Sequence, residues 1–223
     1  MRPKVVSVDM FRTLVDLAAV ENTIWPAVLG GFYTSQLAAD CAAHASSTLF
    51  DYLSPVSFMT CKQVFAACFG DVFAARHIDA DPREAARLWA VRHCSSPAFP
   101  DSLEFLSAVG RKHLLCLASD TDEDMLGPLR QMYPFEHVFT SESLVCYKAY
   151  GDGRFFKAVV DHYGVEPADI IHVGDGVNEI VGAKRAGLVA CWLNRSGFRW
   201  THHLKPDFEV SSLSEAALVL DLG

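Results

Sequence analysis

The chain opens with Val5-Val6-Ser7-Val8-Asp9-Met10-Phe11-Arg12-Thr13-Leu14, an apolar run that ends in a carboxylate. Such a run is typical of a strand buried on both faces, as in the parallel sheets of α/β proteins. These sheets place their ligands beyond the carboxyl ends of the strands, where Asp9 would lie. Two residues later the chain has an aromatic ring, Phe11, where a second carboxylate would be the obvious proton donor. The stretch therefore predicts an α/β scaffold with a reactive Asp9, and leaves the reaction open.

The composition is that of an ordinary globular protein, with 223 residues, 51% hydrophobic and 21% charged. The net charge of −8 comes without any basic stripe, so we expect no nucleic-acid partner. No apolar run approaches the length of a membrane span, and no signal peptide is visible before the first strand. The seven cysteines form no Cys-x-x-Cys pair. Buried, reduced thiols and a cytoplasmic location are the corresponding expectations.

Residues 17–97 are predicted to be almost entirely helical. One helix is indicated by the spacing of apolar residues over 60–73, and another begins at Asp81-Pro82, where Asp is a typical N-cap and Pro a typical first residue. Two prolines, Pro97 and Pro100, then interrupt the chain. We therefore expect a helical cap domain over 17–97, inserted into a core domain formed by 1–16 and 98–223.

The core segment alternates between helices and strands. Asp101 and Glu104 have the spacing of a capping box, and Gly164 is placed to end a helix over 152–163. The expected strands span 113–118, 138–140, 170–173, 188–193 and 208–210, and a last helix begins at Ser214. Strands that alternate with helices predict a doubly wound, Rossmann-like parallel sheet, so the fold class is α/β.

Polar side chains stand at or just after the ends of four segments of this core. They are Asp9, Ser119-Asp120, Lys148, and Asp175 with Glu179. Each alone has an ordinary explanation, as a turn residue, a helix cap or a solvated lysine. A parallel sheet, however, delivers all these ends to one crevice, so the joint pattern indicates a site.

These residue types support covalent catalysis. A carboxylate such as Asp9 can attack phosphorus or carbon to form an aspartyl intermediate. A Mg²⁺ ion held by Asp9, Asp175 and Glu179 would remove the repulsion between three carboxylates and a phosphate. Lys148 would add positive charge beside the nucleophile, and the hydroxyl of Ser119 would bind a phosphate oxygen. We predict Asp9, Ser119 and Lys148 as catalytic residues.

The chain resembles the haloacid dehalogenase superfamily over nearly its whole length. The matching motifs are Asp9-Met10-Phe11-Arg12-Thr13-Leu14, Ser119, Lys148, and Gly174-Asp175-Gly176-Val177-Asn178-Glu179 followed by Gly182-Ala183-Lys184-Arg185-Ala186-Gly187. The resemblance implies a helical cap that closes over a small-molecule substrate, and a metal that also takes the backbone carbonyl of Phe11. It further implies that substrate is bound by residues of the first three motifs, namely Phe11, Arg12, Thr13, Ser119, Asp120 and Lys148.

Phe11 departs from the pattern of phosphatases in this superfamily, which usually carry a second Asp there as general acid and base. Such help is typically worth about 10²–10⁴-fold in rate. An aromatic residue at this position is common in dehalogenases, whose halide leaves unaided, but the metal-free dehalogenases lack the acidic metal site. We therefore predict a Mg²⁺-dependent hydrolase, a phosphatase acting on a small phosphorylated metabolite through an aspartyl-phosphate. The alternatives are a 2-haloacid dehalogenase-like or phosphonatase-like hydrolase, and a catalytically impaired binding or regulatory protein.

Three further features are open to two interpretations. Arg12, where the family often has glycine, grips an anionic substrate group or points to solvent. Asp120 is an N-cap for the turn that follows it, the reading we favour, or a substitute acid. The aromatic residues Phe65, Phe69 and Phe73 on one helix form cap core rather than a substrate-binding surface.

Overall fold

The computed structural model describes residues 3–52, 57–132 and 134–222. A single six-stranded parallel sheet lies at its centre, in the order β3-β2-β1-β4-β5-β6. The strands are β1 (Val5–Val8), β2 (Leu114–Ser119), β3 (His137–Thr140), β4 (Ile170–Gly174), β5 (Val189–Leu193) and β6 (Phe208–Val210). The predicted α/β, doubly wound architecture is thereby confirmed.

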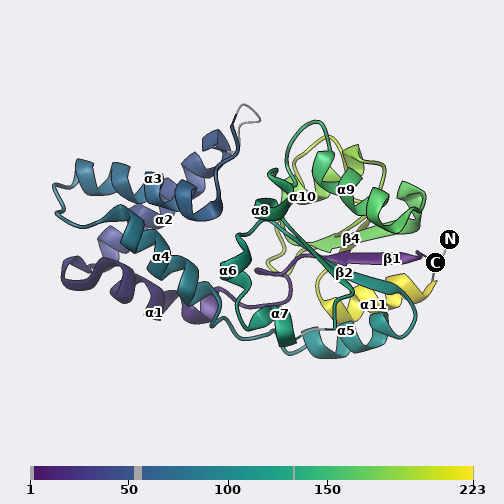
Figure 1. Ribbon diagram of the computed structural model, residues 1–223. Coiled ribbons are helices and arrows are strands. Elements are labelled where there is room, and N and C mark those ends of the chain that lie inside the picture. Colours follow the sequence, from purple (N-terminus) through teal and green to yellow (C-terminus); the bar gives the residue numbers. More distant parts are fainter. Residues whose placement is uncertain (1–2, 53–56, 133, 223) are drawn as a thin grey trace.

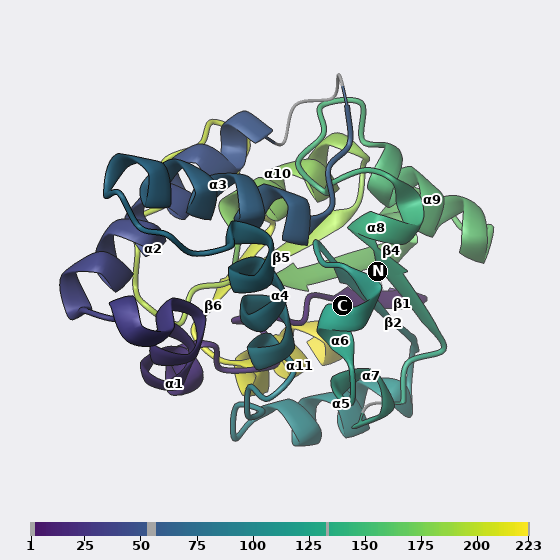
Figure 2. The same cartoon turned by 60° about the vertical axis from the view of Figure 1, so that its left-hand side comes forward.

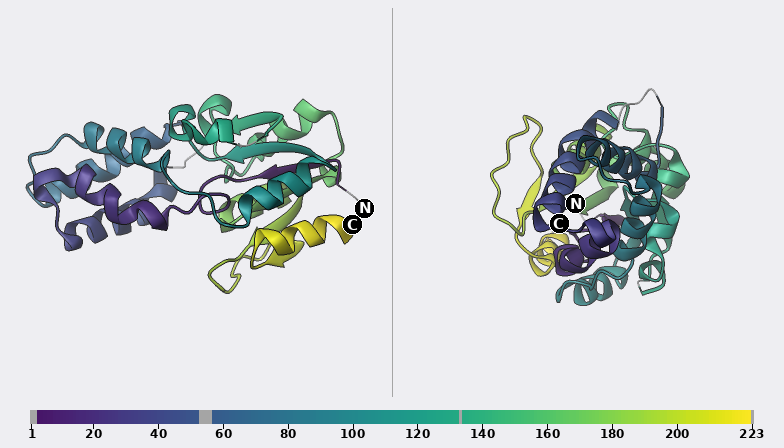
Figure 3. Two further views of the ribbon diagram at one scale, coloured as in Figure 1. Left: turned by 90° about the horizontal axis from the view of Figure 1, so that it is seen from below. Right: turned by 90° about the vertical axis from the view of Figure 1, so that its left-hand side faces the viewer.

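Helices cover both faces of the sheet, which explains why β1 is apolar at nearly every position. On one face Val6 and Val8 pack into a core with α5 (Ser102–Gly110) and α11 (Leu213–Leu222). On the other, Val5 belongs to a core with α9 (Arg154–Tyr163) and α10 (Val177–Arg185). Figures 1 and 3 show these two layers. Along the chain, the short helices α6 (Glu123–Leu126) and α7 (Leu129–Met132) connect β2 to β3, and α8 (Ser141–Leu144) follows β3.

The segment after β1 forms a group of packed helices at one end of the molecule. They are α1 (Ala18–Leu29), α2 (Ser35–Tyr52), α3 (Cys61–Ala75) and α4 (Pro82–His93), and Figure 2 turns them toward the viewer. The two chain termini lie at the other end of the sheet (Figure 1). Because β1 starts near the N-terminus, the carboxyl ends of the parallel strands face these helices. Treating the group as a separate cap domain over 17–97 stays a prediction.

Expected helix caps form at some positions and fail to form at others. Asp81 caps α4 by accepting the N–H of Arg83 at 2.9 Å, as predicted. Asp101, however, makes no capping bond to α5. Its carboxylate accepts two hydrogen bonds from Arg195 and one from the N–H of Leu213. The guanidinium of Arg195, far along the chain, therefore donates to the same oxygens that would accept the capping hydrogen bond.

The thiols match the expectation drawn from their spacing. All seven cysteines are free, and all but Cys94 are buried. None of the helices in the described part of the chain is both long and apolar enough to cross a membrane.

Candidate active site

Three carboxylates converge at the carboxyl ends of the two central strands. Asp9 follows β1, Asp175 follows β4, and Glu179 lies in the first turn of α10. Each offers an oxygen, and these oxygens lie within 4.8 Å of one another. Asp9 continues the strand ladder, since its N–H donates to Val173 at 3.0 Å. The cluster predicted from separate motifs is therefore brought together at the switch point of the sheet.

Glu179 reaches the cluster because glycine leaves room for it. Its Oε1 accepts the N–H of Gly176 at 2.7 Å, which folds the side chain back over the start of α10. A Cβ at Gly174 would lie 2.3 Å from that same oxygen, well inside contact distance. The two glycines of the Gly-Asp-Gly sequence before α10 therefore leave space for the Glu179 carboxylate and also form the turn.

Lys148 is the cation at the centre of the cluster and is almost fully buried. Its Nζ donates to Oδ1 of Asp9 at 2.8 Å, to the carbonyl of Ala118 at 3.1 Å, and to Oε2 of Glu179. Close packing holds its backbone, because a Cβ at Gly182 would lie 2.1 Å from the Lys148 carbonyl oxygen. The ammonium therefore bridges the predicted nucleophile and a predicted metal ligand.

Asp9 is held by one of its oxygens only. Ser119 donates from Oγ to Oδ1 of Asp9 at 2.9 Å, and Lys148 donates to the same atom. Among the described residues, Oδ2 of Asp9 accepts no hydrogen bond. This arrangement orients the carboxylate and leaves one oxygen available for a metal or for attack on a substrate.

His172 and Ser7 form a buried hydrogen-bonded pair that holds Glu179 and that the sequence motifs did not indicate. They are register partners on β4 and β1, and Nδ1 of His172 lies 3.0 Å from Oγ of Ser7. Nε2 of His172 lies 3.1 Å from Oε2 of Glu179. Because the carboxylate can only accept, Nε2 carries the proton and Nδ1 accepts from Ser7. Two polar residues within otherwise apolar strands are the signal that could have revealed this pair.

The pKa values show where negative charge is poorly compensated. Burial raises the pKa of Asp9 despite the nearby Lys148. Burial would also raise the pKa of Glu179, but Lys148 and His172 outweigh it and lower that pKa to about 2. Burial, reinforced by Glu179 and Asp9, raises the pKa of Asp175 to about 7. The surroundings therefore disfavour the ionised forms of both Asp9 and Asp175.

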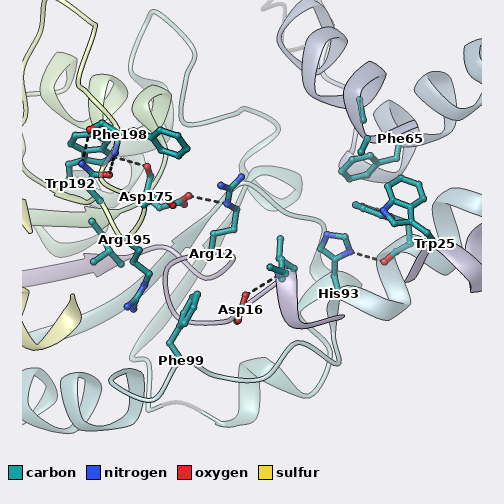
Figure 4. A pocket seen from close by; sticks show the side chains of 18 of the residues that line it. Arg12, Asp16, Trp25, Phe65, His93, Phe99, Asp175, Trp192, Arg195 and Phe198 are labelled. Carbon is teal, nitrogen blue, oxygen red and sulfur yellow. Dashed lines mark hydrogen bonds and ion pairs between the residues drawn. The ribbon is translucent and has the colours of Figure 1, made fainter. Parts of the chain in front are cut away.

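Arg12 partly offsets the negative charge of Asp175 from the solvent side. Its Nε lies 3.3 Å from Oδ2 of Asp175, although 64% of the side chain is exposed (Figure 4). Its φ of 67° is in the left-handed region that favours glycine. The side chain thus pairs within the site, which neither of the two sequence-based interpretations foresaw.

Two residues predicted to bind substrate make hydrogen bonds to other residues of the site. Thr13 is fully buried, and its Oγ1 accepts the N–H of Asp175 at 3.2 Å. Asp120 accepts the N–H of Lys148 at 2.9 Å, and burial raises its pKa to about 7. The favoured N-cap role of Asp120 is wrong, because Asp122 is the N-cap residue of α6. We assign both Thr13 and Asp120 to positioning, since the bonds that they make orient Asp175 and Lys148.

The side chain at position 11 brings no acid into the site. The ring of Phe11 meets the ring of His93 edge-on, with centroids 5.6 Å apart. It also packs, half-buried, against the cores on both faces of the sheet. Its backbone carbonyl as a metal ligand stays a prediction from the family resemblance.

A cavity of about 620 Å³ opens beside Asp175 and Arg12, between helices α1–α4 and the sheet. Seven aromatic rings besides His93 line it, namely Trp25, Phe65, Phe69, Trp89, Phe99, Trp192 and Phe198. Figure 4 shows Trp25, Phe65 and His93 on one side, and Trp192 and Phe198 on the other. Phe69 and Phe73 are buried in the core of the helical group, as expected, but Phe65 and Phe69 also face the cavity.

His93 is expected to make folding stability depend on pH. Burial lowers its pKa to about 4, while an unfolded histidine titrates near 6.5. The unfolded state therefore binds a proton first as the pH falls. The contribution of His93 to the free energy of unfolding is complete above pH 6.5. Protonation of His93 should lower the free energy of unfolding by about 3 kcal/mol between pH 6.5 and 4. Urea unfolding of the native protein and of His93→Gln across this range measures the contribution. The variant should show the shallower loss, and equal slopes would contradict the assignment.

Comparisons with known proteins agree with this geometry. A family described as haloacid dehalogenase-like hydrolases matches residues 3–187. The (S)-2-haloacid dehalogenase of Pseudomonas sp. (strain YL) is 27% identical over 149 residues, which are 63% of this chain and 63% of that protein. The match thus spans less than two thirds of that relative's length.

Two solved structures share the fold across nearly the whole chain. The HAD-hydrolase YfnB from Bacillus subtilis, bound to magnesium, has a TM-score of 0.86 at 18% identity and covers 99% of this chain and 100% of its own. The L-2-haloacid dehalogenase from Xanthobacter autotrophicus, with chloropropionic acid covalently bound, has a TM-score of 0.81 at 16% identity and covers 98% of each chain. At these identities the likeness shows the fold alone.

Proposed function

This chain belongs to the haloacid dehalogenase-like hydrolases, and we propose that it is a Mg²⁺-dependent phosphatase that works through an aspartyl-phosphate on Asp9. Its substrate would be a small phosphorylated molecule. The observation that carries the proposal is the cluster of Asp9, Asp175 and Glu179, whose oxygens lie within 4.8 Å of one another. A site that released only a halide anion would gain nothing from Asp175, whose ionised form the surroundings disfavour.

The donor set fits a hard divalent cation. Magnesium prefers carboxylate and carbonyl oxygens and is usually held by one or two carboxylates together with substrate phosphates. Asp9 and Asp175 each have an oxygen that faces the cluster, and the carboxylate of Asp175 pairs with the exposed Arg12 and with no other described side chain. Bound Mg²⁺ would neutralise the carboxylates and the phosphate. Asp9, Asp175, Glu179 and the carbonyl of Phe11 are the proposed ligands.

The residues of the chain then have distinct roles. Asp9, oriented through its Oδ1, attacks phosphorus with its other oxygen. Lys148 holds a fixed positive charge beside the attacking carboxylate, where charge shifts during transfer. Ser119 donates to the Asp9 carboxylate and keeps it in place, and its hydroxyl would contact an oxygen of the bound phosphate. Water then hydrolyses the aspartyl-phosphate and regenerates Asp9.

Removal of the metal tests this proposal. Metal-stripped protein is assayed against phosphate esters, phosphonates and haloacids, with and without added Mg²⁺. We expect phosphate release only with Mg²⁺, and we expect Asp175→Asn to need at least about tenfold more Mg²⁺ because a ligand is lost. Asp161→Asn, an exposed carboxylate on α9, is the matched control and should behave like the native protein. Phosphate release that changes neither on addition of Mg²⁺ nor in Asp175→Asn would contradict the proposed role of Asp175 as a Mg²⁺ ligand.

Carbon–halogen cleavage is the second candidate. It is favoured by the aromatic Phe11 and by the 27% identity to an (S)-2-haloacid dehalogenase. Arg12, on the rim of the cavity, would then bind the carboxylate of the haloacid. The same panel separates the two functions, because a dehalogenase would release halide from metal-stripped protein and leave the phosphate esters intact.

A further inference from the structure

Two features of the site are left unused by the proposed reaction, the apolar side chain at position 11 and the aromatic cavity. We propose that the substrates are aryl phosphates, monoesters in which phosphate is attached to the oxygen of an aromatic ring. This inference rests on the proposed phosphatase function and names its substrate class. Two independent observations lead to it, one on binding and one on the leaving group.

The size and lining of the cavity suit a substrate that carries an aromatic group. Its volume of about 620 Å³ lies within the range of about 300–1,000 Å³ typical of small-molecule sites. A phosphate held at the carboxylate cluster would occupy only the end beside Asp175 and Arg12. The remaining space lies between rings of the helical group, such as Trp89 and Phe65, and rings of the core, such as Trp192 and Phe198.

These rings form a wall suited to a flat apolar group. The ring centroids of Trp25 and Trp89 lie 4.6 Å apart, and those of Phe65 and Trp89 lie 5.6 Å apart. Aromatic pairs gain about 0.5–1.5 kcal/mol each beyond the burial of their area. A planar ring can stack on such a wall, whereas a polyhydroxylated sugar or glycerol would lose hydrogen bonds to water there.

Phe11 restricts the leaving groups that the site can release. An alkyl phosphate must release an alkoxide whose conjugate acid is about as weak as water, with a pKa near 15.7, so it depends on a proton donor. A phenol has a pKa of about 10, as in a tyrosine side chain. An aryloxide can therefore leave without a proton. Phe11 supplies none, and its neighbour on the cavity side is another ring, that of His93.

The proposed step balances without a general acid. An oxygen of Asp9 forms a bond to phosphorus while the bond from phosphorus to the aryl oxygen breaks. The aryl oxygen departs with the electron pair and takes a proton from water after release. A second water then attacks phosphorus and the bond to Asp9 breaks. One proton of that water stays on the released phosphate, and the other neutralises the hydroxide left when the aryloxide was protonated. The net reaction converts aryl phosphate and water into a phenol and inorganic phosphate.

Three substrates test the inference at saturating Mg²⁺. They are 1-naphthyl phosphate, propyl phosphate, and acetyl phosphate, which has a carboxylate leaving group and no ring. We expect kcat/KM for naphthyl phosphate to exceed that for propyl phosphate by at least about 100-fold, the scale of missing acid catalysis. Phe11→Asp should raise propyl phosphate turnover at least about tenfold relative to naphthyl phosphate. Phe11→Asn, which matches it in size but donates no acidic proton, should not.

The contribution of the cavity is tested on its rim, where a substitution does not endanger folding. Phe198, which is 66% exposed, is replaced by Ala, and Phe208→Ala on β6 is the matched exposed control. Phe198→Ala should lower the ratio of naphthyl to acetyl phosphate turnover about 2- to 10-fold, the loss of one ring contact. Phe208→Ala should leave this ratio unchanged.

The outcomes separate this inference from the proposed function. Hydrolysis of acetyl phosphate with no preference for naphthyl over propyl phosphate would overturn the aryl assignment and leave the phosphatase proposal standing. Hydrolysis of none of the three would overturn both. An aryl preference that Phe198→Ala does not change would overturn the role of the cavity.

Discussion

Replacing Asp9 by Asn is expected to lower kcat by about 10⁴–10⁶-fold, the usual scale for loss of a covalent nucleophile. The amide cannot form the covalent intermediate. The fold should survive, because burial raises the pKa of Asp9 and thus already disfavours its charged form, so a neutral side chain of equal shape is tolerated. Circular dichroism and the urea midpoint check folding, and phosphate or halide release measures turnover.

The control for Asp9→Asn is again Asp161→Asn, on the exposed surface of α9. It makes the same chemical change away from the site and should keep full activity. An Asp9→Asn protein that retains more than about 1% of native kcat would show that Asp9 is not the nucleophile. This test holds for phosphoryl transfer and for dehalogenation, because both attack through a carboxylate.

Replacing Lys148 by Met is expected to lower the free energy of unfolding by about 3–5 kcal/mol and to abolish turnover. The substitution leaves the buried carboxylates of Asp9 and Glu179 without their ammonium partner. The loss should be smaller at acidic pH, where protonation relieves the unpaired charge. Added Mg²⁺ should restore part of the stability if the carboxylates hold a cation. Urea unfolding with and without Mg²⁺ measures both effects.

Lys184→Met provides the comparison for Lys148→Met. Lys184 pairs with Asp207 at 2.7 Å, but 26% and 35% of these side chains are exposed. An exposed pair contributes only about 0–1 kcal/mol, so the control should lose little stability. If both variants lost the same free energy of unfolding, the buried carboxylates would not be the reason that Lys148→Met is destabilising.

Much of the fold follows from local patterns. The apolar runs gave all six strands to within a residue or two, because a strand buried on both faces has few polar positions. Asp81 at the start of α4 and Gly164 at the end of α9 act through bonds within a few residues. Asp101 failed as a local cap because a distant guanidinium, Arg195, competes for the same oxygens.

The cluster of carboxylates around Lys148 was predictable for a related reason. Parallel strands end at one edge of the sheet, so Asp9, Lys148, Asp175 and Glu179 needed no detailed geometry to be placed together. Thr13 and Asp120 could not be assigned in this way. Both lie in the right motifs, but their side chains bind the backbone N–H groups of Asp175 and Lys148, and nothing local distinguishes such a bond from one to a substrate.

By itself, the sequence determined the parallel sheet, the position of Asp9 at its edge, and the absence of an acid at Phe11. Each depends on the order of residues within one segment and on a general rule of sheet topology. Only the tertiary structure decided that Arg12 pairs with Asp175, that His172 pairs with Ser7 on the neighbouring strand, and that aromatic rings from separate helices, strands and loops enclose one cavity. Those contacts join residues far apart along the chain, and their distances are set by the packing of whole helices and strands.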